Sequence, residues 1–231
     1  MWKRYIIIQN LIIEMMDGYI IGAGGQARQV ENIINVCDIK VKLMGFITKE
    51  DDSEKIVHGY KVFQENIIEN LDSKKVLFFN GMGRPNRRIP IQKLESDGFS
   101  FLGLIHPRST IGNYVKIGRG TVIQSGVQFM TDIKVGNYVL ADVSSTIGHD
   151  VEIGDYTTIS TGVNIAGGVK IGNGTWIGSG SVIIEGIEIG DNVLIGAGSI
   201  VTKNIEGNTL AYGSPAKIVK SIDDVSKALI K

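Results

Sequence analysis

Residues 147–176 read IGHDVE-IGDYTT-ISTGVN-IAGGVK-IGNGTW, and an isoleucine opens each of these hexads. The same spacing runs without a slip from Ile105 to Glu206, with Ile or Val at almost every first position. A period of six fits neither the turn of an α-helix nor the simple alternation of a strand. It is the sequence signature of a parallel β-helix, a solenoid of short strands and tight turns.

The hexads also predict how this solenoid is filled and how it associates. Three hexads make one coil, so we expect about eighteen residues per coil and about five to six coils. The inward Ile and Val positions then stack into a continuous apolar core that no single coil could supply. Bare β faces tend to pair with other chains, so we expect a closed oligomer, with a homotrimer as the simplest arrangement.

The N-terminal half has a different pattern. Residues 17–21 read as a strand, GAGGQARQ follows, and a helical pattern comes next; further strands end at Thr48 and at the loop GMGRPNRR. Strands that alternate with helices at these lengths predict a small parallel α/β domain, Rossmann-like, over residues 17–104. The stretch FSFLGLIHP, residues 99–107, reads as one strand that leads into the solenoid.

Two terminal segments lie outside these domains. The stretch MWKRYIIIQNLIIEMM, residues 1–16, is too short to span a membrane and lacks a signal-peptide cleavage site. We interpret it as a leader outside the fold, with Met15 or Met16 as the start. After the solenoid domain, residues 105–218, we expect an extended tail and a short C-terminal helix over residues 219–231.

Composition excludes some classes of partner. The formal net charge is zero, which gives no electrostatic basis for binding nucleic acid or an anionic membrane. The single cysteine, Cys37, excludes an intrachain disulfide and favours a cytoplasmic location. Because Cys37 sits in an apolar helical pattern, we interpret it as a buried structural thiol and not as a nucleophile.

The GAGGQA loop resembles a phosphate-binding turn. Its glycines let the backbone approach an anion, and the helix that follows supplies N–H donors. The dinucleotide pattern is incomplete, because Ala27 replaces the third glycine and Thr48 and Lys49 stand near the place of the ribose-binding acid. We therefore expect a nucleotide-bearing substrate and not a nicotinamide cofactor. The alternative is a glycine-rich turn without a ligand.

A second loop, GMGRPNRR, also follows a strand. Gly83 allows close approach of a ligand, and Arg84, Arg87 or Arg88 could bind a pyrophosphate with paired N–H donors. At least one of these arginines is expected to have only a structural role.

His149 is the candidate catalytic residue of the solenoid. The third position of a hexad should lie at a corner and face outward, and Asp150 could orient the imidazole by a hydrogen bond. The other ring nitrogen would then be free to act as a general base. The alternative is an exposed corner histidine without a function.

Taken together, the chain resembles the left-handed β-helix acyltransferases that carry a small nucleotide-binding α/β domain. This family contains sialic acid O-acetyltransferases and N-acetyltransferases for the 4-amino group of nucleotide-linked sugars. The resemblance covers residues 17–218 and rests on GAGGQAR, HGYKVF, GMGRPNRR, LIHPRSTIG, IGHD and YGSPAK. It implies a left-handed solenoid, acetyl-CoA as co-substrate and active sites between adjacent subunits of a homotrimer.

The resemblance also implies roles for individual residues. His149 matches the catalytic base, and Asp150 matches the acid that raises its basicity. Thr158 stands where the family usually has a histidine that contacts acetyl-CoA. It further implies that backbone groups hold acetyl-CoA at three positions (Gly167, Ser179 and Ala197) and that six positions hold the sugar nucleotide (Gly24, Gly25, Gln26, Thr48, Lys49 and Gly83).

Other functions remain open at this point. A metal-dependent carbonic anhydrase uses the same solenoid but needs three converging histidines. Here His58, His106 and His149 are the only histidines, and only the last is in mid-solenoid, so we expect no metal site. A nucleotide-sugar-binding scaffold would not need His149. O-acetylation of a sialic acid is the runner-up, and N-acetylation is favoured because both nucleotide loops are retained.

Overall fold

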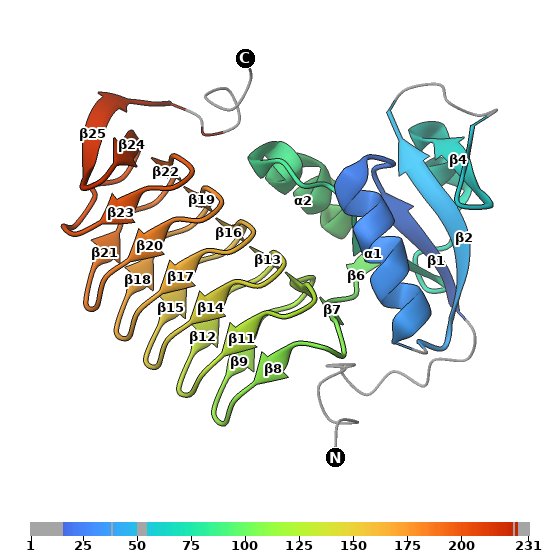
Figure 1. The fold of residues 1–231 in the computed structure, drawn as a ribbon. Coiled ribbons are helices and arrows are strands. Elements are labelled where there is room, and N and C mark those ends of the chain that lie inside the picture. The colour runs from blue at the N-terminus through green and yellow to red at the C-terminus, as the bar shows by residue number, and fades with distance from the viewer. Residues whose placement is uncertain (1–15, 38, 50–54, 224, 226–231) are drawn as a thin grey trace. The chain divides into compact units, whose positions relative to one another are not determined.

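The computed structural model describes residues 16–37, 39–49, 55–223 and 225. They form two compact units. The first contains the described residues up to Ile105 except 84–86, and the second contains residues 84–86 and the described residues from His106 onward. The first is an α/β unit, called here the N-terminal unit, and the second is a left-handed parallel β-helix, called here the solenoid (Figure 1). The predicted fold class is confirmed.

The N-terminal unit contains one sheet with the strand order β3-β4-β2-β1-β5-β6. Neighbouring strands are parallel except for the short hairpin between β3 and β4. Its strands are β1 (Met16–Ile21), β2 (Val41–Thr48), β3 (Ile56–Val57), β4 (Tyr60–Gln64), β5 (Val76–Asn80) and β6 (Ser100–Phe101). Its helices are α1 (Gly25–Val36), α2 (Arg88–Ser96) and two 3-10 helices (Glu65–Asn70 and Pro85–Arg87).

The strand order reverses at β1. The chain passes from β1 through α1 to β2 on one side, and later returns to place β5 on the other side of β1. Helix α1 forms because Val30, Ile33 and Ile34 fall on one face, and all three are buried. In open parallel sheets, ligands bind beyond the carboxyl ends of the strands at such a switch point. Here that point lies between β1 and β5.

The solenoid has three sheets, called here faces 1, 2 and 3. Face 1 consists of β7 (Leu104–Ile105), β10 (Val122–Ile123), β13 (Leu140–Ala141), β16 (Thr158–Ile159), β19 (Trp176–Ile177), β22 (Leu194–Ile195), β24 (Thr209–Gly213) and β25 (Ala216–Ser221). Face 2 consists of β8 (Thr110–Ile111), β11 (Gln128–Phe129), β14 (Thr146–Ile147), β17 (Asn164–Ile165), β20 (Val182–Ile183) and β23 (Ile200–Val201). Face 3 consists of β9 (Lys116–Ile117), β12 (Lys134–Val135), β15 (Glu152–Ile153), β18 (Lys170–Ile171) and β21 (Glu188–Ile189).

Coils stack with a register of eighteen residues, so that Thr158 pairs with Trp176 and Ile165 pairs with Ile183. The first residue of each hexad points inward: Ile147, Ile159 and Ile177 are fully buried. Corners carry the tight turns, and the second turn residue has positive φ at most of them, as at Asp150 (58°) and Gly168 (68°). Glycine is the most frequent residue there because it adopts this conformation without a steric penalty, although Tyr114, Tyr138 and Tyr156 adopt it as well. The predicted stacking of inward hexad positions is confirmed.

Three boundaries differ from the sequence reading. Met16, grouped there with the leader, is the first residue of β1. The stretch FSFLGLIHP forms two short strands in two different sheets and not one strand, because the chain breaks at Leu102 and Gly103. The expected extended tail is an antiparallel hairpin of β24 and β25 that runs to Ser221. The leader up to residue 15 and most of the predicted C-terminal helix lie outside the described residues.

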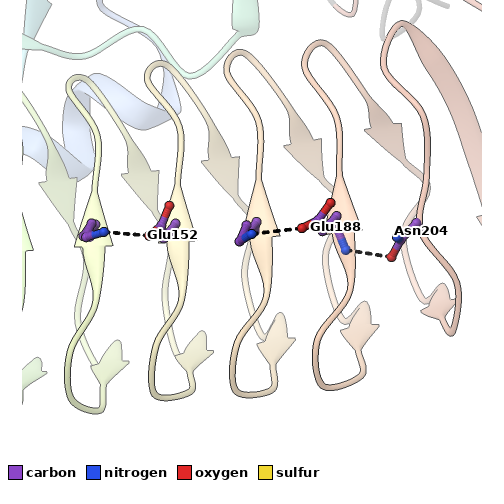
Figure 2. A network of polar contacts seen from close by, with 5 residues as sticks. Glu152, Glu188 and Asn204 are labelled. Carbon is purple, nitrogen blue, oxygen red and sulfur yellow. Dashed lines mark hydrogen bonds and ion pairs between the residues drawn. The ribbon is translucent and has the colours of Figure 1, made fainter.

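Face 3 carries a ladder of charged side chains along the stacked coils. Figure 2 shows Glu152, Glu188 and Asn204 in line along the coils. Lys134 donates to Glu152 over 2.7 Å, and Lys170 donates to Glu188 over 3.0 Å. The hydrogen bond from Lys134 lowers the pKa of Glu152, and the bond to Glu188 raises the pKa of Lys170. These pairs are exposed, so each contributes little to stability.

Candidate active site

Two glycine loops meet at the switch point of the N-terminal sheet. The first, which begins at Gly22, leaves the carboxyl end of β1, and the second, which begins at Gly81, leaves that of β5. Gly81 N–H donates to the Ile21 carbonyl over 3.0 Å, which holds the two strand ends together. Gly22 has a φ of 102°, a conformation that favours glycine and turns the chain toward α1.

The alanine at position 27 is explained by its close packing against the end of β5, the strand beside β1. In dinucleotide-binding loops the third glycine allows close packing of helix and strand. Here Ala27 is fully buried against Gly81, where an added Cβ would lie 2.8 Å from the Ala27 Cβ. It would also lie 2.5 Å from Cγ2 of Ile20. The close approach that a helical glycine normally allows is therefore provided by Gly81 at the end of β5.

The predicted sugar-nucleotide residues come together at this edge. Gly24 and Gly25 begin α1, and a Cβ added at either one would meet no protein atom within 4 Å. Gly83 lies against Gln26, with 3.3 Å between a Cβ added at position 83 and the Gln26 Cβ. Thr48 ends β2 and Lys49 follows it, on the other side of β1. The open glycines and the N-terminus of α1 can accept an anionic group.

Asn80 is a further polar residue at this edge that the sequence reading did not single out. It is fully buried at the end of β5, and its Oδ1 accepts the N–H of Met82 over 3.1 Å. Its Nδ2 has no hydrogen-bond partner within the described part of the chain. The signal in the sequence was a single amide after the apolar run Val76–Phe79. Of the three loop arginines, Arg87 is fully buried, while Arg84 and Arg88 are exposed.

His149 lies at the corner between faces 2 and 3, called here the His149 corner. Its Nδ1 lies 2.9 Å from Oδ2 of Asp150, and the two side chains are 58% and 69% exposed. Since a carboxylate only accepts, Nδ1 is the donor of this hydrogen bond, and in a neutral ring the lone pair is then on Nε2. The predicted pairing of His149 with Asp150 is confirmed as geometry; the catalytic role remains a prediction.

The predicted acetyl-CoA residues are distributed over the solenoid. Gly167 is buried in the coil after His149 and at the same corner. Ser179 and Ala197 are exposed in successive coils at a different corner, between faces 1 and 2. Thr158 lies in β16 on face 1; it is buried, and its Oγ1 has no hydrogen-bond partner among the described residues. One chain therefore does not bring all four positions together.

The other histidines have separate partners. His58 lies in the β3–β4 turn, and its Nδ1 is 2.9 Å from Oε2 of the buried Glu31. The buried His106 accepts the N–H of Arg108 at Nδ1 over 3.0 Å. Within the described ranges, no group of three or more His, Cys, Asp or Glu side chains could hold a metal ion.

Cys37 follows α1 and is partly buried. Its Sγ donates to the carbonyl of Ile105 over 3.3 Å. Burial raises the pKa of the Cys37 thiol, which disfavours the nucleophilic thiolate. This environment agrees with a structural thiol. No helix of the described chain is long and apolar enough to cross a membrane.

His106 should make the stability of the solenoid pH-dependent. Burial, and next the charge of Arg108, lower the pKa of His106, so the folded chain binds fewer protons than the unfolded chain. The contribution of neutral His106 to the free energy of unfolding is fully present above the usual histidine pKa of about 6.5. It is lost as the pH falls below that value. Between about pH 7.5 and pH 5.5, the free energy of unfolding of wild type should fall relative to that of His106→Asn, whose side-chain oxygen can still accept the N–H of Arg108. Urea unfolding measures this; parallel pH profiles would contradict it.

A broad groove of about 920 Å³ lies along face 3 and is separate from these candidate residues. Its lining includes Lys134, Glu152, Lys170 and Glu188, the ladder of Figure 2, together with Ile218. His149, Gly167, Ser179 and Ala197 do not line it. Lys134 is paired with Glu152 and Lys170 with Glu188, and Glu206 is the remaining charged residue of the lining, so the groove offers no concentrated charge to a ligand.

Two family models match the sequence. The PglD N-terminal domain matches residues 19–93, and the bacterial transferase hexapeptide (six repeats) matches residues 168–203. A comparison with curated proteins gave no match.

Solved structures resemble both units. A histidine variant of perosamine N-acetyltransferase from Caulobacter crescentus, in complex with CoA and GDP-perosamine, is 26% identical, with a TM-score of 0.82 over 89% of this chain and 97% of its own. The acetyltransferase domain of PglB from Neisseria gonorrhoeae is 24% identical, with a TM-score of 0.80 over 88% of this chain and 100% of its own. WeeI from Acinetobacter baumannii AYE is 24% identical, with a TM-score of 0.65 over 89% and 100%.

Proposed function

We propose that this chain, a left-handed β-helix acetyltransferase with a PglD-type N-terminal domain, acetylates the 4-amino group of a nucleotide-linked amino sugar. The observation that carries the proposal is the His149–Asp150 pair, 2.9 Å apart at an exposed corner of the solenoid. The two glycine loops at the switch point support a nucleotide on the acceptor.

The relatives identify the class of the enzyme and support the class of its acceptor. The chain is an acetyl-CoA-dependent acyltransferase: the relative with 26% identity, which matches nearly the whole chain, was solved with CoA. That relative was also solved with GDP-perosamine, which supports a nucleotide-linked sugar as acceptor here.

The proposed mechanism is direct transfer. The amine nitrogen of the acceptor attacks the thioester carbonyl of acetyl-CoA, and Nε2 of His149 takes a proton from this amine. Asp150 keeps the imidazole oriented and stabilises the imidazolium that forms. The backbone of Gly167, which lies against the imidazole, is the proposed donor to the oxyanion. When the tetrahedral intermediate collapses, the C–S bond breaks, CoA leaves as the thiolate, and the proton held by His149 can pass to it.

We further propose a homotrimer with the active site between neighbouring subunits. In one chain, His149 and Gly167 lie at one edge of face 2, and Ser179 and Ala197 lie at the other. A second copy placed against face 2 can bring these two sets of residues onto one acetyl-CoA. Face 2 also exposes Val182 and, one coil on, Ile200, with the exposed Ile184 directly after Val182–Ile183, and this apolar surface favours such packing.

The setting of the reaction is proposed on the same grounds. A nucleotide-linked amino sugar is an activated donor for glycan assembly, so we place the enzyme in the synthesis of a surface polysaccharide or a protein glycan. The single cysteine and the use of acetyl-CoA agree with a cytoplasmic enzyme. Neither nucleic acid nor a membrane is a proposed partner.

Thiol release from acetyl-CoA tests the proposal. The acceptors are UDP-, dTDP- and GDP-linked 4-amino sugars, with free and CMP-linked sialic acids in the same panel. We expect release only with one class of amino sugar, and an acetamide product by mass spectrometry. Release only with a sialic acid would establish the O-acetyltransferase alternative. Binding of a sugar nucleotide without release from any acceptor would favour the scaffold.

Gly25→Val tests the acceptor half of the site. A Cβ at Gly25 meets no protein atom within 4 Å, and its φ is not in the left-handed region, so the fold should accept the side chain. A nucleotide on the N-terminus of α1 would meet it. We expect KM for the sugar nucleotide to rise about tenfold or more, which corresponds to roughly 1.4 kcal/mol. KM for acetyl-CoA and the unfolding midpoint should stay unchanged; an unaltered KM for the sugar nucleotide would place that ligand elsewhere.

A further inference from the structure

The imidazole of His149 occupies the space that a side chain at position 167 would fill. An ideal Cβ on Gly167 would lie 2.5 Å from Cε1 of His149, 2.6 Å from Nε2 and 3.0 Å from Nδ1. These are the three nearest atoms to it, and they all belong to the one ring. A side chain at position 167 and the imidazole of His149 therefore cannot occupy this space at the same time.

The turn itself does not require glycine at this position. The left-handed conformation falls on the next residue, Gly168, with a φ of 68°, and Gly167 has no such φ. The equivalent positions one coil before His149 and one coil after Gly167 carry side chains, Thr131 and Glu185. Hydrogen bonds from residues 150, 168 and 186 to the carbonyls of 131, 149 and 167 show that these positions are equivalent. The atoms that a side chain at 167 would meet first all belong to the imidazole.

An exposed histidine needs such a support. The His149–Asp150 hydrogen bond is at the surface, with both side chains more than half exposed, and a surface ion pair contributes only about 0–1 kcal/mol. By itself it orders the ring weakly. Contact with Gly167 adds a second restraint from the next coil, and the ring in turn covers this glycine, which is buried.

We propose that Gly167 is a positioning residue, which orients the catalytic imidazole of His149 by leaving the space for it in the next coil. This role rests on the proposed function. It depends on the absence of a side chain at position 167, and not on the backbone groups of that residue. An alanine here would force the ring out of this space. A displacement of about 1 Å can cost a catalytic group up to roughly a hundredfold in rate.

The first test is Gly167→Ala, with Glu185→Ala as the matched control one coil on at the same corner. We expect kcat of Gly167→Ala to fall by about tenfold or more. KM for acetyl-CoA and the dissociation constant of CoA should each change by less than about twofold. The unfolding midpoint should change little. Glu185→Ala should keep wild-type kcat. An unchanged kcat in Gly167→Ala, or a loss only in CoA affinity, would overturn the proposal.

A double-mutant cycle separates an action through His149 from an independent one. If Gly167 acts only by positioning the imidazole, Gly167→Ala should cause no further loss of kcat in the His149→Ala background. A further loss of about tenfold there would show that Gly167 contributes to catalysis without His149, and would overturn the proposal.

A spectroscopic measurement keeps the inference separate from the proposed acceptor. The chain has three histidines, so the ring signals of His149 in an NMR spectrum can be assigned by their absence in His149→Ala. Gly167→Ala should shift the His149 ring signals and leave those of His58 and His106 in place. If wild type acetylates no acceptor, the proposed function fails but this shift still supports the positioning role. Unshifted His149 signals would refute that role whatever the activity.

Discussion

His149→Ala is expected to lower kcat by about a hundredfold or more, because the neighbouring carboxylate of Asp150 is a much weaker base than the imidazole that is lost. CoA should still bind, since the imidazole is not required to hold the pantetheine arm. Single-turnover rates and CoA titrations measure the two effects separately. Turnover near that of wild type would exclude His149 as the base.

Asp150→Asn is the matched control for this result. Asp150 has a φ of 58°, a conformation that asparagine also tolerates, so the turn should persist. The amide oxygen can still accept the Nδ1 proton, but it no longer carries the charge that stabilises the imidazolium. We expect a smaller loss of kcat than in His149→Ala. A loss as large as that of His149→Ala would mean that the charge of Asp150, and not the orientation, is its main contribution.

Ile153→Ala is expected to destabilise the solenoid by about 2–5 kcal/mol, the usual cost of a buried isoleucine-sized cavity. Ile153 is almost fully buried and stacks between Val135 and Ile171 of the coils on either side. Each coil packs only against its neighbours, so a cavity in mid-stack weakens contacts on both sides. Urea unfolding at fixed protein concentration measures the change.

Glu152→Ala, in the same strand, is the control. Glu152 points outward, where it accepts a hydrogen bond from Lys134 over 2.7 Å. An exposed pair of this kind is worth at most about 1 kcal/mol. Equal losses in the two variants would mean that the inward stack does not dominate the stability of the solenoid.

The hexads predicted the solenoid well because inward positions must be apolar in every coil, and this demand is visible in the sequence. The corner location of His149 follows from the same count. The direction in which its ring turns does not, since it depends on packing against Gly167 in the next coil. From the resemblance, Gly167 was expected to act through its backbone; its missing side chain became meaningful only when the imidazole was seen in that space.

The N-terminal unit shows a similar limit. The alternation of strands and helices predicted the parallel sheet, because buried strands and an amphipathic helix leave distinct patterns. The pairing of Ala27 with Gly81 was not predictable, since it depends on which strand lies beside β1. Asn80 was missed for the same reason: its location at the switch point is a property of the strand order.

The eighteen-residue register also determines which changes of chain length the molecule can tolerate. Loss or gain of one whole coil before His149 leaves every later residue on its own face and only shortens or lengthens the stack. Loss of a single hexad moves every later residue to the preceding face. A hexad lost between His149 and Gly167 would place Asn173 against the imidazole in place of the glycine. Among natural variants of such a chain, solenoid lengths should therefore differ by whole coils, and the interval from His149 to Gly167 should stay constant.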